Sequence, residues 1–204
     1  MHIAIISGSH RKGSQSARIA HYLAVRLLIV EPTASADVIE LTGNPLPLWD
    51  DENNSRTTSP ELQKIWDPYA TRLQAADGLI VVSPEWHGMV PAGLKNFFVY
   101  WSPKEVGHKP ALITTVSASI NGAYPVNELR TSGYKNSRLC YIPEQLIIRN
   151  AATIFNGDTP SGKDDEYLRG RADFALKILV EYTKALKPVR ESGITFDKRY
   201  ASGM

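Results

Sequence analysis

Short apolar runs that alternate with longer amphipathic segments constrain the fold of this chain more than any other feature. The five runs are His2–Ile6, Val38–Leu41, Leu79–Val82, Ala111–Val116 and Leu146–Ile148. The first run is rich in β-branched residues, shows no alternation of polar and apolar side chains, and ends at Ser7-Gly8-Ser9. Such a run is typical of a buried strand in a parallel sheet and not of a strand with one solvated face.

Helical periodicity lies between the runs. After the first run, Ile19, Leu23 and Leu27 recur at the spacing of one helix face, which predicts a helix there. Further helices are expected from Leu62, from Pro91, near Pro125–Tyr134 and after Asp164-Asp165. Strands that alternate with helices in this way indicate an α/β fold whose parallel sheet is covered on both faces.

A proline interrupts one of the helical stretches. Asp67-Pro68 lies inside an apolar stripe that starts with Leu62, Ile65 and Trp66. Proline is tolerated best at the first position of a helix. The sequence therefore predicts a short turn there, followed by a new helix that Asp67 caps and Pro68 opens.

Composition and charge exclude several classes of protein. The chain has 204 residues, of which 43% are apolar and 22% charged, and a formal net charge of +2. These values are ordinary for a globular domain and give no reason to expect nucleic acid or a membrane as a partner. The lone cysteine, Cys140, excludes an internal disulfide and fits a reducing cytosol. The five histidines are scattered, so no metal site is predicted.

The chain is expected to form one domain, over residues 1–190, followed by a polar, glycine-bearing tail over 191–204. The tail is predicted to be ordered only by a neighbour, if at all. No charged leader precedes the first strand, and no apolar run approaches the ~18–20 residues of a membrane span. The predicted location is cytoplasmic.

The loop between the first strand and the first helix has the composition of a phosphate site. It offers serine hydroxyls, a glutamine amide, two glycines and two cations at a predicted helix N-terminus, where unpaired N–H groups favour an anion. The candidate binding residues are Ser9, Arg11, Ser14, Gln15 and Ser16. Ordinary turn chemistry is the alternative explanation of this composition. The loop matches neither G-x-G-x-x-G nor the Walker sequence, which disfavours a dinucleotide fingerprint and an NTPase.

The loop after the third strand is the second candidate. If the strands take the order 2-1-3-4-5, strands one and three are neighbours and this loop faces the phosphate loop. A proline, an aromatic side chain and exposed amides can lie along a flat heterocycle. The candidates here are Pro84, Glu85, Trp86, His87 and Gly88, joined by Ser117 and Gly122 from the loop after the fourth strand. Taken singly, Trp86 is better explained by packing and Glu85 or His87 by solvent exposure, whereas together, opposite the phosphate loop, these residues favour a ligand site.

These motifs resemble those of the NADPH-dependent FMN reductase family, which includes quinone, azo-dye and chromate reductases. Gly8–Ser14 is similar to the family's G-S-x-R-x-x-S loop, and Pro84–Gly88 to its P-E-Y-N-G segment. Pro45–Asp51 and Val90–Asn96 resemble its L-P-L-[YF]-D and I-P-G-x-L-K-N segments. The resemblance covers roughly the first 150 residues. Three positions depart from the pattern, because Trp86 replaces tyrosine, His87 replaces asparagine, and Ser16 stands where asparagine is frequent.

The resemblance implies a flavodoxin-like three-layer sandwich with a five-stranded parallel sheet of order 2-1-3-4-5. It implies bound FMN, reduced by NADPH or NADH, which then reduces a flavin, a quinone or a similar small-molecule acceptor. No residue is proposed as a catalytic acid or base, because the cofactor carries the chemistry. Two alternatives stay open: a flavodoxin-type electron carrier without its own substrate, and a flavin-free scaffold or sensor. The small positive charge speaks against the carrier.

The expected helix from Pro91 to Trp101 bears on assembly. Phe97, Phe98 and Tyr100 join Trp101 to make it apolar on more than one face, whereas a surface helix needs only one apolar stripe. One interpretation is a subunit interface, and the resemblance implies a homodimer or homotetramer. The other is that the long proline-bearing stretch Thr42–Pro60 covers the second face.

Overall fold

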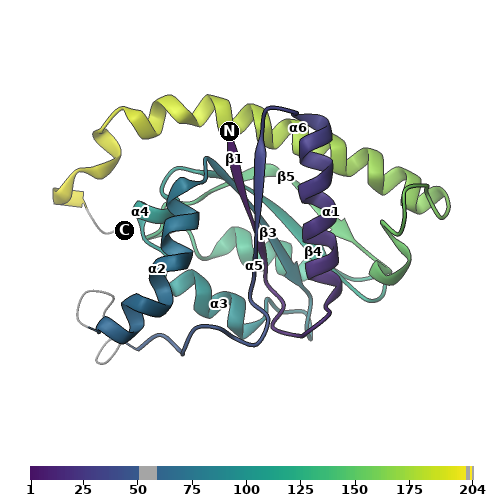
Figure 1. Ribbon diagram of the computed structural model, residues 1–204, viewed down its shortest axis with the longest axis horizontal. Helices are drawn as coiled ribbons and strands as arrows, with labels where there is room; N and C mark the ends of the chain where they lie inside the picture. The colour runs from purple at the N-terminus through teal and green to yellow at the C-terminus, as the bar shows by residue number, and fades with distance from the viewer. Residues whose placement is uncertain (51–58, 201–202, 204) are drawn as a thin grey trace.

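Five parallel strands form the sheet of the protein in the order β2-β1-β3-β4-β5 (Figure 1). The computed structural model describes residues 1–50, 59–200 and 203. The strands are β1 (His2–Ser7), β2 (Ser35–Glu40), β3 (Gly78–Pro84), β4 (Pro110–Val116) and β5 (Cys140–Ile148). This architecture confirms the α/β class and the strand order that the family resemblance implies.

The central strands are buried on both faces. Every residue of β3 and β4 is buried, which explains why their sequences carry no alternation of polar and apolar residues. In β1, Ile3 and Ile5 face one layer of helices, and Ala4 and Ile6 face the other. The edge strand β2 is more exposed, as expected for a strand with a single neighbour.

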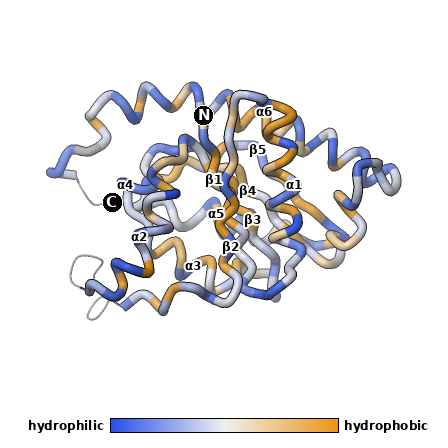
Figure 2. The backbone as a smooth tube through the Cα atoms, in the orientation of Figure 1, coloured by the Kyte–Doolittle hydropathy of each residue, from blue (hydrophilic) through white to orange (hydrophobic). Residues whose placement is uncertain are grey.

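Helices cover both faces of the sheet (Figures 1 and 2). On one face lie α1 (Gln15–Val30) and α6 (Lys163–Glu191), and on the other α2 (Pro60–Ala75), α3 (Ala92–Val99), α4 (Pro103–Val106) and α5 (Ala123–Thr131). Buried apolar residues of each long helix, such as Leu23 of α1, Leu73 of α2 and Leu179 of α6, pack in the clusters on the two faces of the sheet. The described chain thus forms the three-layer sandwich.

The prediction of a break at Pro68 is wrong, because α2 continues through this residue from Pro60 to Ala75. Ser59 caps the helix instead, through its hydroxyl, which accepts a hydrogen bond from Leu62 N at 3.2 Å. Trp66 is 3% exposed and Leu73 is fully buried. Because the residues on both sides of Pro68 pack into the core, this burial outweighs the ~3 kcal/mol that a proline costs inside a helix.

Several predicted boundaries also differ from the structure, since β2 spans Ser35–Glu40 and not Val38–Leu41, and α3 spans Ala92–Val99 within the predicted Pro91–Trp101. The strand β5 begins at Cys140 and not near Leu146. The last helix begins at Lys163, so that Asp164 and Asp165 lie in its first turn instead of preceding it. Acidic side chains in the first turn interact favourably with the positive end of the helix dipole, which explains their position.

The C-terminal residues pack against the loop before β5. Two short 3-10 helices, Ile194–Phe196 and Lys198–Tyr200, follow α6. Arg138 donates hydrogen bonds to the carbonyl of Thr195, at 2.7 Å, and to the carbonyl of Tyr200. The tail therefore has contacts within this chain, while the division between a domain and a tail stays a prediction. Among the helices that the structure describes, none is long and apolar enough to cross a membrane.

Candidate functional site

The candidate site lies at the carboxyl edge of the sheet, where β1 and β3 are neighbours. The chain leaves β1 toward β2 on one side and returns to β3 on the other, so the strand order reverses at this point. In open α/β sheets such a point leaves a crevice between two loops, and ligands bind there. The loops after β1, β3 and β4 therefore share one edge, as the sequence predicted.

The loop after β1 meets the N-terminus of α1 in a geometry that suits an anion, and we call this place the anion site at α1. Ser14 is the N-cap residue, and its Oγ accepts a hydrogen bond from Ala17 N at 3.1 Å. The hydroxyl keeps its own proton for a ligand. The other amides of the first helical turn have no partner within the helix. Arg11 and Lys12 are exposed and form no ion pair with any residue that the structure describes.

The other predicted phosphate residues differ in exposure. Ser9 and Ser16 are 2% and 1% exposed, whereas Arg11 and Gln15 are exposed. The Oγ of Ser9 accepts a hydrogen bond from Arg11 N, at 3.3 Å, within the loop itself. The Oε1 of Gln15 accepts from Arg18 Nε, which leaves the amide nitrogen of Gln15 available to a ligand.

Gly8 fixes the loop close to the sheet. Its amide donates to the carbonyl of Val82 in β3, at 2.8 Å. A Cβ at this position would lie 2.5 Å from Leu94 Cδ2 and 3.0 Å from Val82 O. Because no larger side chain fits, the glycine of the predicted motif is required for the contact between the loop, β3 and α3.

The loop after β3 forms a tight hairpin turn. Trp86 and Met89 exchange backbone hydrogen bonds, with N···O distances of 3.1 and 2.9 Å. The two residues between them, His87 and Gly88, have positive φ angles of 51° and 75°. Two consecutive left-handed residues define a type I′ turn, which favours asparagine followed by glycine. His87 therefore occupies a left-handed position, which is uncommon for L residues in general but which asparagine, aspartate and histidine take more often than the others.

The two loops touch through a pair of rings that the sequence did not predict. The ring centroids of His10 and Trp86 lie 4.5 Å apart, at an angle of 76°. The Nδ1 atom of His10 is buried and has no hydrogen-bond partner among the described residues. His10 was missed because it occupies the variable position of the motif, between Ser9 and Arg11. This nitrogen lies beside the start of α3, 3.9 Å from the position that a Cβ on Gly93 would take.

A cavity of about 590 Å³, which we call the ring cavity, opens beside this turn. Its lining comes from the loops after β3 and β4 and the start of α5, and consists of Glu85, His87, Gly88, Ser117, Ala118, Ser119, Asn121 and Tyr124. Its volume falls in the range of pockets that hold a small organic ligand. The structure thus places three of the predicted residues after β3, and Ser117 after β4, around one cavity.

Other predicted residues contribute structure to the cavity. The Oε2 atom of Glu85 accepts a hydrogen bond from Gly122 N at 2.6 Å, and the Gly122 carbonyl accepts one from Thr115 Oγ1 at 2.6 Å. Pro84 is buried within β3 and has no N–H. Because the polar groups of Gly122 are already paired, this residue shapes the loop and has no free donor for a ligand. Glu85 ties the two loops together.

The aromatic residues of α3 and the segment after it are buried within the chain. Phe97, Tyr100 and Trp101 are 1%, 0% and 4% exposed. The Tyr100 hydroxyl donates to Pro47 O at 3.0 Å, so the segment after β2 covers this side of α3. These aromatics therefore do not indicate a subunit interface. Residues 51–58 of the predicted loop, including Asp51 of its motif, lie outside the described residues.

Comparison with known protein families identifies the family of this chain. Residues 1–153 match the model of the family described as NADPH-dependent FMN reductase. The chain belongs to this family. The matched part contains all three loops of the site.

Relatives in the NADPH-dependent FMN reductase family carry several activities. The chain is 30% identical over 174 residues to a 2-hydroxy-1,4-benzoquinone reductase of a Burkholderia species, covering 82% of this chain and 90% of that protein. It is 28% identical over 152 residues to an NADPH azoreductase of a Bacillus strain, covering 72% of this chain and 76% of that protein. The family membership makes this protein an NAD(P)H-dependent flavin oxidoreductase at the level of the family.

Solved structures share the fold. An oxidoreductase from Corynebacterium diphtheriae superposes with a TM-score of 0.67 at 17% identity, covering 90% of this chain and 97% of that one. A flavoenzyme NAD(P)H:(acceptor) oxidoreductase from Paracoccus denitrificans gives a TM-score of 0.63 at 19% identity, covering 89% and 98%. At these identities the likeness shows the flavodoxin-like fold alone.

The residues of this chain fit the FMN that the family uses. The loop before α1 offers the amides of the first helical turn, the cations Arg11 and Lys12, which pair with no carboxylate among the described residues, and Gly8, where no Cβ has room. The neighbouring cavity has the size for a heterocyclic ring and backbone groups along one side. The ring contact of His10 with Trp86 joins the loop after β1 to the turn after β3. A phosphate and a flat ring on one ligand match this pairing of an anion site with a cavity.

Proposed function

We propose that this protein binds FMN non-covalently and transfers electrons from NADPH or NADH to a flavin, a quinone or a similar flat acceptor. The observation that carries the proposal is the contact between the anion site at α1 and the turn after β3, made by His10 and Trp86 at 4.5 Å. This contact brings the loop after β1 and the turn after β3 together at one edge of the sheet, which supports a ligand that spans both. The names of the reductase relatives support the same reaction class.

The residues of the chain bind and orient, and the cofactor, when bound, supplies the hydride and electron chemistry. The α1 amides with Ser9, Ser14 and Arg11 would hold the phosphate. The turn that contains His87 and Gly88 would lie along the edge of the ring. Metal ions have no role in the proposal.

A direct experiment tests the proposal. The purified protein, mixed with FMN, should show the absorbance of bound flavin and should oxidise NADPH in the presence of free FMN, a quinone or an azo dye. Absence of flavin binding would favour the scaffold or sensor alternative. Flavin binding without oxidation of NADPH or NADH by the isolated protein would favour the electron-carrier alternative.

Arg11→Ala is expected to weaken FMN binding by about 1.5–3 kcal/mol, the range for a hydrogen bond to a charged group. Arg11 is exposed and has no carboxylate partner among the described residues, so its guanidinium is free to bind phosphate. Fluorescence quenching of FMN measures the affinity. Arg199→Ala is the control, because Arg199 pairs with Asp197 in the tail. An unchanged affinity in Arg11→Ala would remove Arg11 from the site.

His87→Asn is expected to widen the range of acceptors. His87 is exposed, lines the ring cavity and occupies a left-handed turn position, which asparagine also tolerates. A smaller side chain leaves more room for a bulky, twisted dye, whose kcat/KM should rise at least about threefold relative to a flat quinone. His87→Gly, which keeps the turn and removes the side chain, should act in the same direction. Identical acceptor profiles in parent and both variants would contradict the role of His87.

We also expect a homodimer or homotetramer, on grounds other than the aromatics of α3. Met89, Ile120 and Tyr124, which are 52%, 72% and 67% exposed, are large apolar side chains on the loops and helix beside the ring cavity. Exposed apolar side chains that gather beside a cavity mark an interaction surface. Sedimentation velocity at micromolar concentration should show an assembly larger than a monomer, and a monomer would end this expectation.

A further inference from the structure

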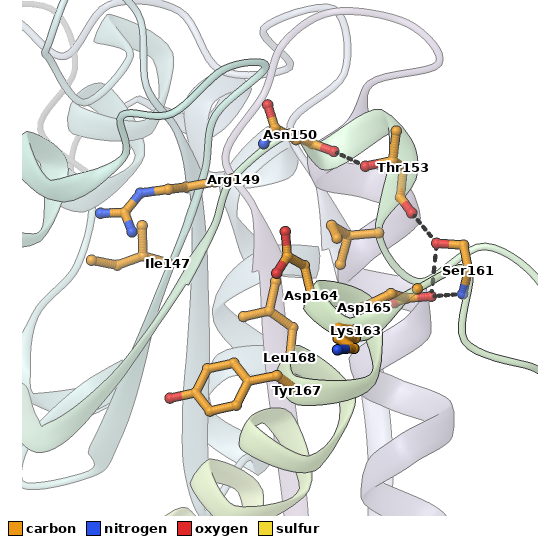
Figure 3. Close-up of a pocket in the computed structure, with 12 residues that line it drawn as sticks. Ile147, Arg149, Asn150, Thr153, Ser161, Lys163, Asp164, Asp165, Tyr167 and Leu168 are labelled. Carbon is orange, nitrogen blue, oxygen red and sulfur yellow. Dashed lines mark hydrogen bonds between the residues drawn. The ribbon is translucent and has the colours of Figure 1, made fainter.

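A second cavity, of about 560 Å³, lies outside the site described so far, between the end of β5 and the start of α6 (Figure 3). Ile147 and Leu168 line its apolar part. Arg149, Asp164 and Tyr167 lie on different sides of it (Figure 3). A cavity of this size and mixed lining suits a small organic molecule with polar ends.

One loop separates this cavity from the ring cavity. The Nε atom of Arg149 donates to the Asn121 carbonyl at 3.1 Å, and Asn150 N donates to the Ser119 carbonyl at 2.9 Å. Arg149 and Asn150 line the second cavity, whereas Ser119 and Asn121 line the ring cavity. A ligand longer than one ring system can therefore occupy both cavities by passing over the loop after β4.

The walls of the second cavity are held by buried polar contacts. Asp165, which is 1% exposed, accepts hydrogen bonds from Phe155 N at 2.8 Å and Ser161 N at 2.9 Å. Arg18 donates to the carbonyls of Ala151 and Phe155, at 2.6 and 3.0 Å. The loop between β5 and α6 is thereby fixed to α1 and α6, so the cavity is preformed and a ligand need not order it.

The charges around the cavity select the kind of ligand. Arg149 is exposed and has no carboxylate partner within the described ranges, so its terminal nitrogens can bind a phosphate through two parallel hydrogen bonds. Asp164 repels a phosphate from the start of α6 but accepts hydrogen bonds from sugar hydroxyls. The ring of Tyr167 is 69% exposed and can stack on a base. An anionic end, a hydroxyl-bearing sugar and a flat base together describe a nucleotide.

We propose that the second cavity binds the adenosine diphosphate half of the nicotinamide dinucleotide, with its phosphates on Arg149, its ribose at Asp164 and its base against Tyr167. The inference rests on the proposed function, because that function requires a nicotinamide at the ring cavity next door. The proposal assigns a role to Arg149, which lies near the end of the region that matches the family model, residues 1–153, and to Asp164 and Tyr167, which lie beyond it.

The test uses the FMN-loaded protein and ADP as the probe. Isothermal titration calorimetry should show saturable binding of ADP. Arg149→Ala should weaken it about tenfold, equivalent to a lost hydrogen bond to a charged group. Tyr167→Ala should weaken it about threefold or more, whereas Tyr167→Phe, which keeps the ring, should bind like the parent. Arg199→Ala, in the tail, is the matched control and should bind like the parent.

A kinetic readout separates this inference from a general loss of structure. ADP should compete with the nicotinamide dinucleotide and not with the acceptor. Arg149→Ala should raise KM for the dinucleotide by the factor seen in calorimetry, with the flavin absorbance and KM for a quinone unchanged. Absence of ADP saturation up to ~10 mM, or equal ADP affinity in parent and Arg149→Ala, would overturn the inference.

The two proposals fail differently. If the parent oxidises NADPH or NADH but ADP neither binds nor competes, the proposed function stands and the nucleotide site is wrong. If ADP binds in a manner that depends on Arg149 but the protein oxidises neither dinucleotide, the cavity is a nucleotide site and the reductase function is wrong, together with the assignment to nicotinamide.

Discussion

Asp165→Ala is expected to lower the free energy of unfolding by about 3–5 kcal/mol, the range for removing one partner of a buried charged pair. The carboxylate is 1% exposed and accepts hydrogen bonds from the amides of Phe155 and Ser161 and from Arg169 Nε, the last at 3.2 Å. Alanine leaves these donors without an acceptor inside the protein. Urea denaturation followed by circular dichroism measures the difference.

Asp164→Ala is the matched control. This carboxylate precedes Asp165 in the same helical turn, is exposed, and has no hydrogen-bond partner among the residues that the structure describes. Its removal should change the free energy of unfolding by no more than about 0.5 kcal/mol, as for most surface substitutions. Equal effects of the two substitutions would show that the contacts of Asp165 do not hold the loop.

The stabilisation by Asp165 should depend on pH in acid. Burial by itself raises the pKa of Asp165, but the amides of Phe155 and Ser161 and the guanidinium of Arg169 outweigh it and hold the pKa below the ordinary 3.8. Because the folded pKa is the lower one, the contribution is complete above 3.8 and is lost as pH falls through the folded value. The difference in the free energy of unfolding between the parent and Asp165→Asn should therefore shrink as the pH falls below 3.8. A difference independent of pH in this range would contradict the ionised state.

Gly122→Ala is expected to destabilise the protein by about 2–5 kcal/mol, from the strain of a positive φ and from overpacking. Gly122 has φ +113°, and a Cβ would lie 2.7 Å from Ile147 Cγ2. Its amide is bonded to Glu85 Oε2, at 2.6 Å, so a shift of this residue also moves the loop that lines the ring cavity. We therefore expect weaker FMN binding as well as a lower free energy of unfolding.

Gly157→Ala is the control for this substitution. Gly157 has φ +63°, but a Cβ there would meet no heavy atom within 4 Å. The cost should then be limited to the left-handed conformation, about 1–2 kcal/mol, and FMN binding should stay at the level of the parent. Chemical denaturation and FMN titration of both variants give the comparison. If Gly122→Ala costs no more than Gly157→Ala and binds FMN like the parent, the contact with Ile147 is unimportant.

Local patterns were sufficient to predict most of the framework of the site. A fully buried strand such as β3 has a continuous apolar sequence whatever surrounds it. The serine- and glycine-containing loop after β1 and the proline after β3 mark strand ends by their own conformational preferences. Because parallel strands place their carboxyl ends at one edge, the neighbouring positions of β1 and β3 then bring their loops together.

Contacts between distant residues decided what local patterns misjudged or left open. Pro68 disfavours a helix locally, yet burial of Trp66 and Leu73 keeps α2 continuous. The aromatic side chains after Pro91 left two interpretations open, a subunit interface or cover by the stretch after β2, and the hydrogen bond from Tyr100 to Pro47 favours the second. The residues around each position could suggest a covering segment but could not decide which contact forms.

The sequence by itself determined the class of fold, the order of its elements and the two loops that form the candidate site. These properties follow from the periodicity of apolar residues and from turn residues, both of which act within a few positions along the chain. Only the tertiary structure decided the contact of His10 with Trp86, the hydrogen bond from Gly122 to Glu85, and the cavity beside Arg149. Each depends on side chains from separate loops, whose approach is set by the packing of the helices on the sheet.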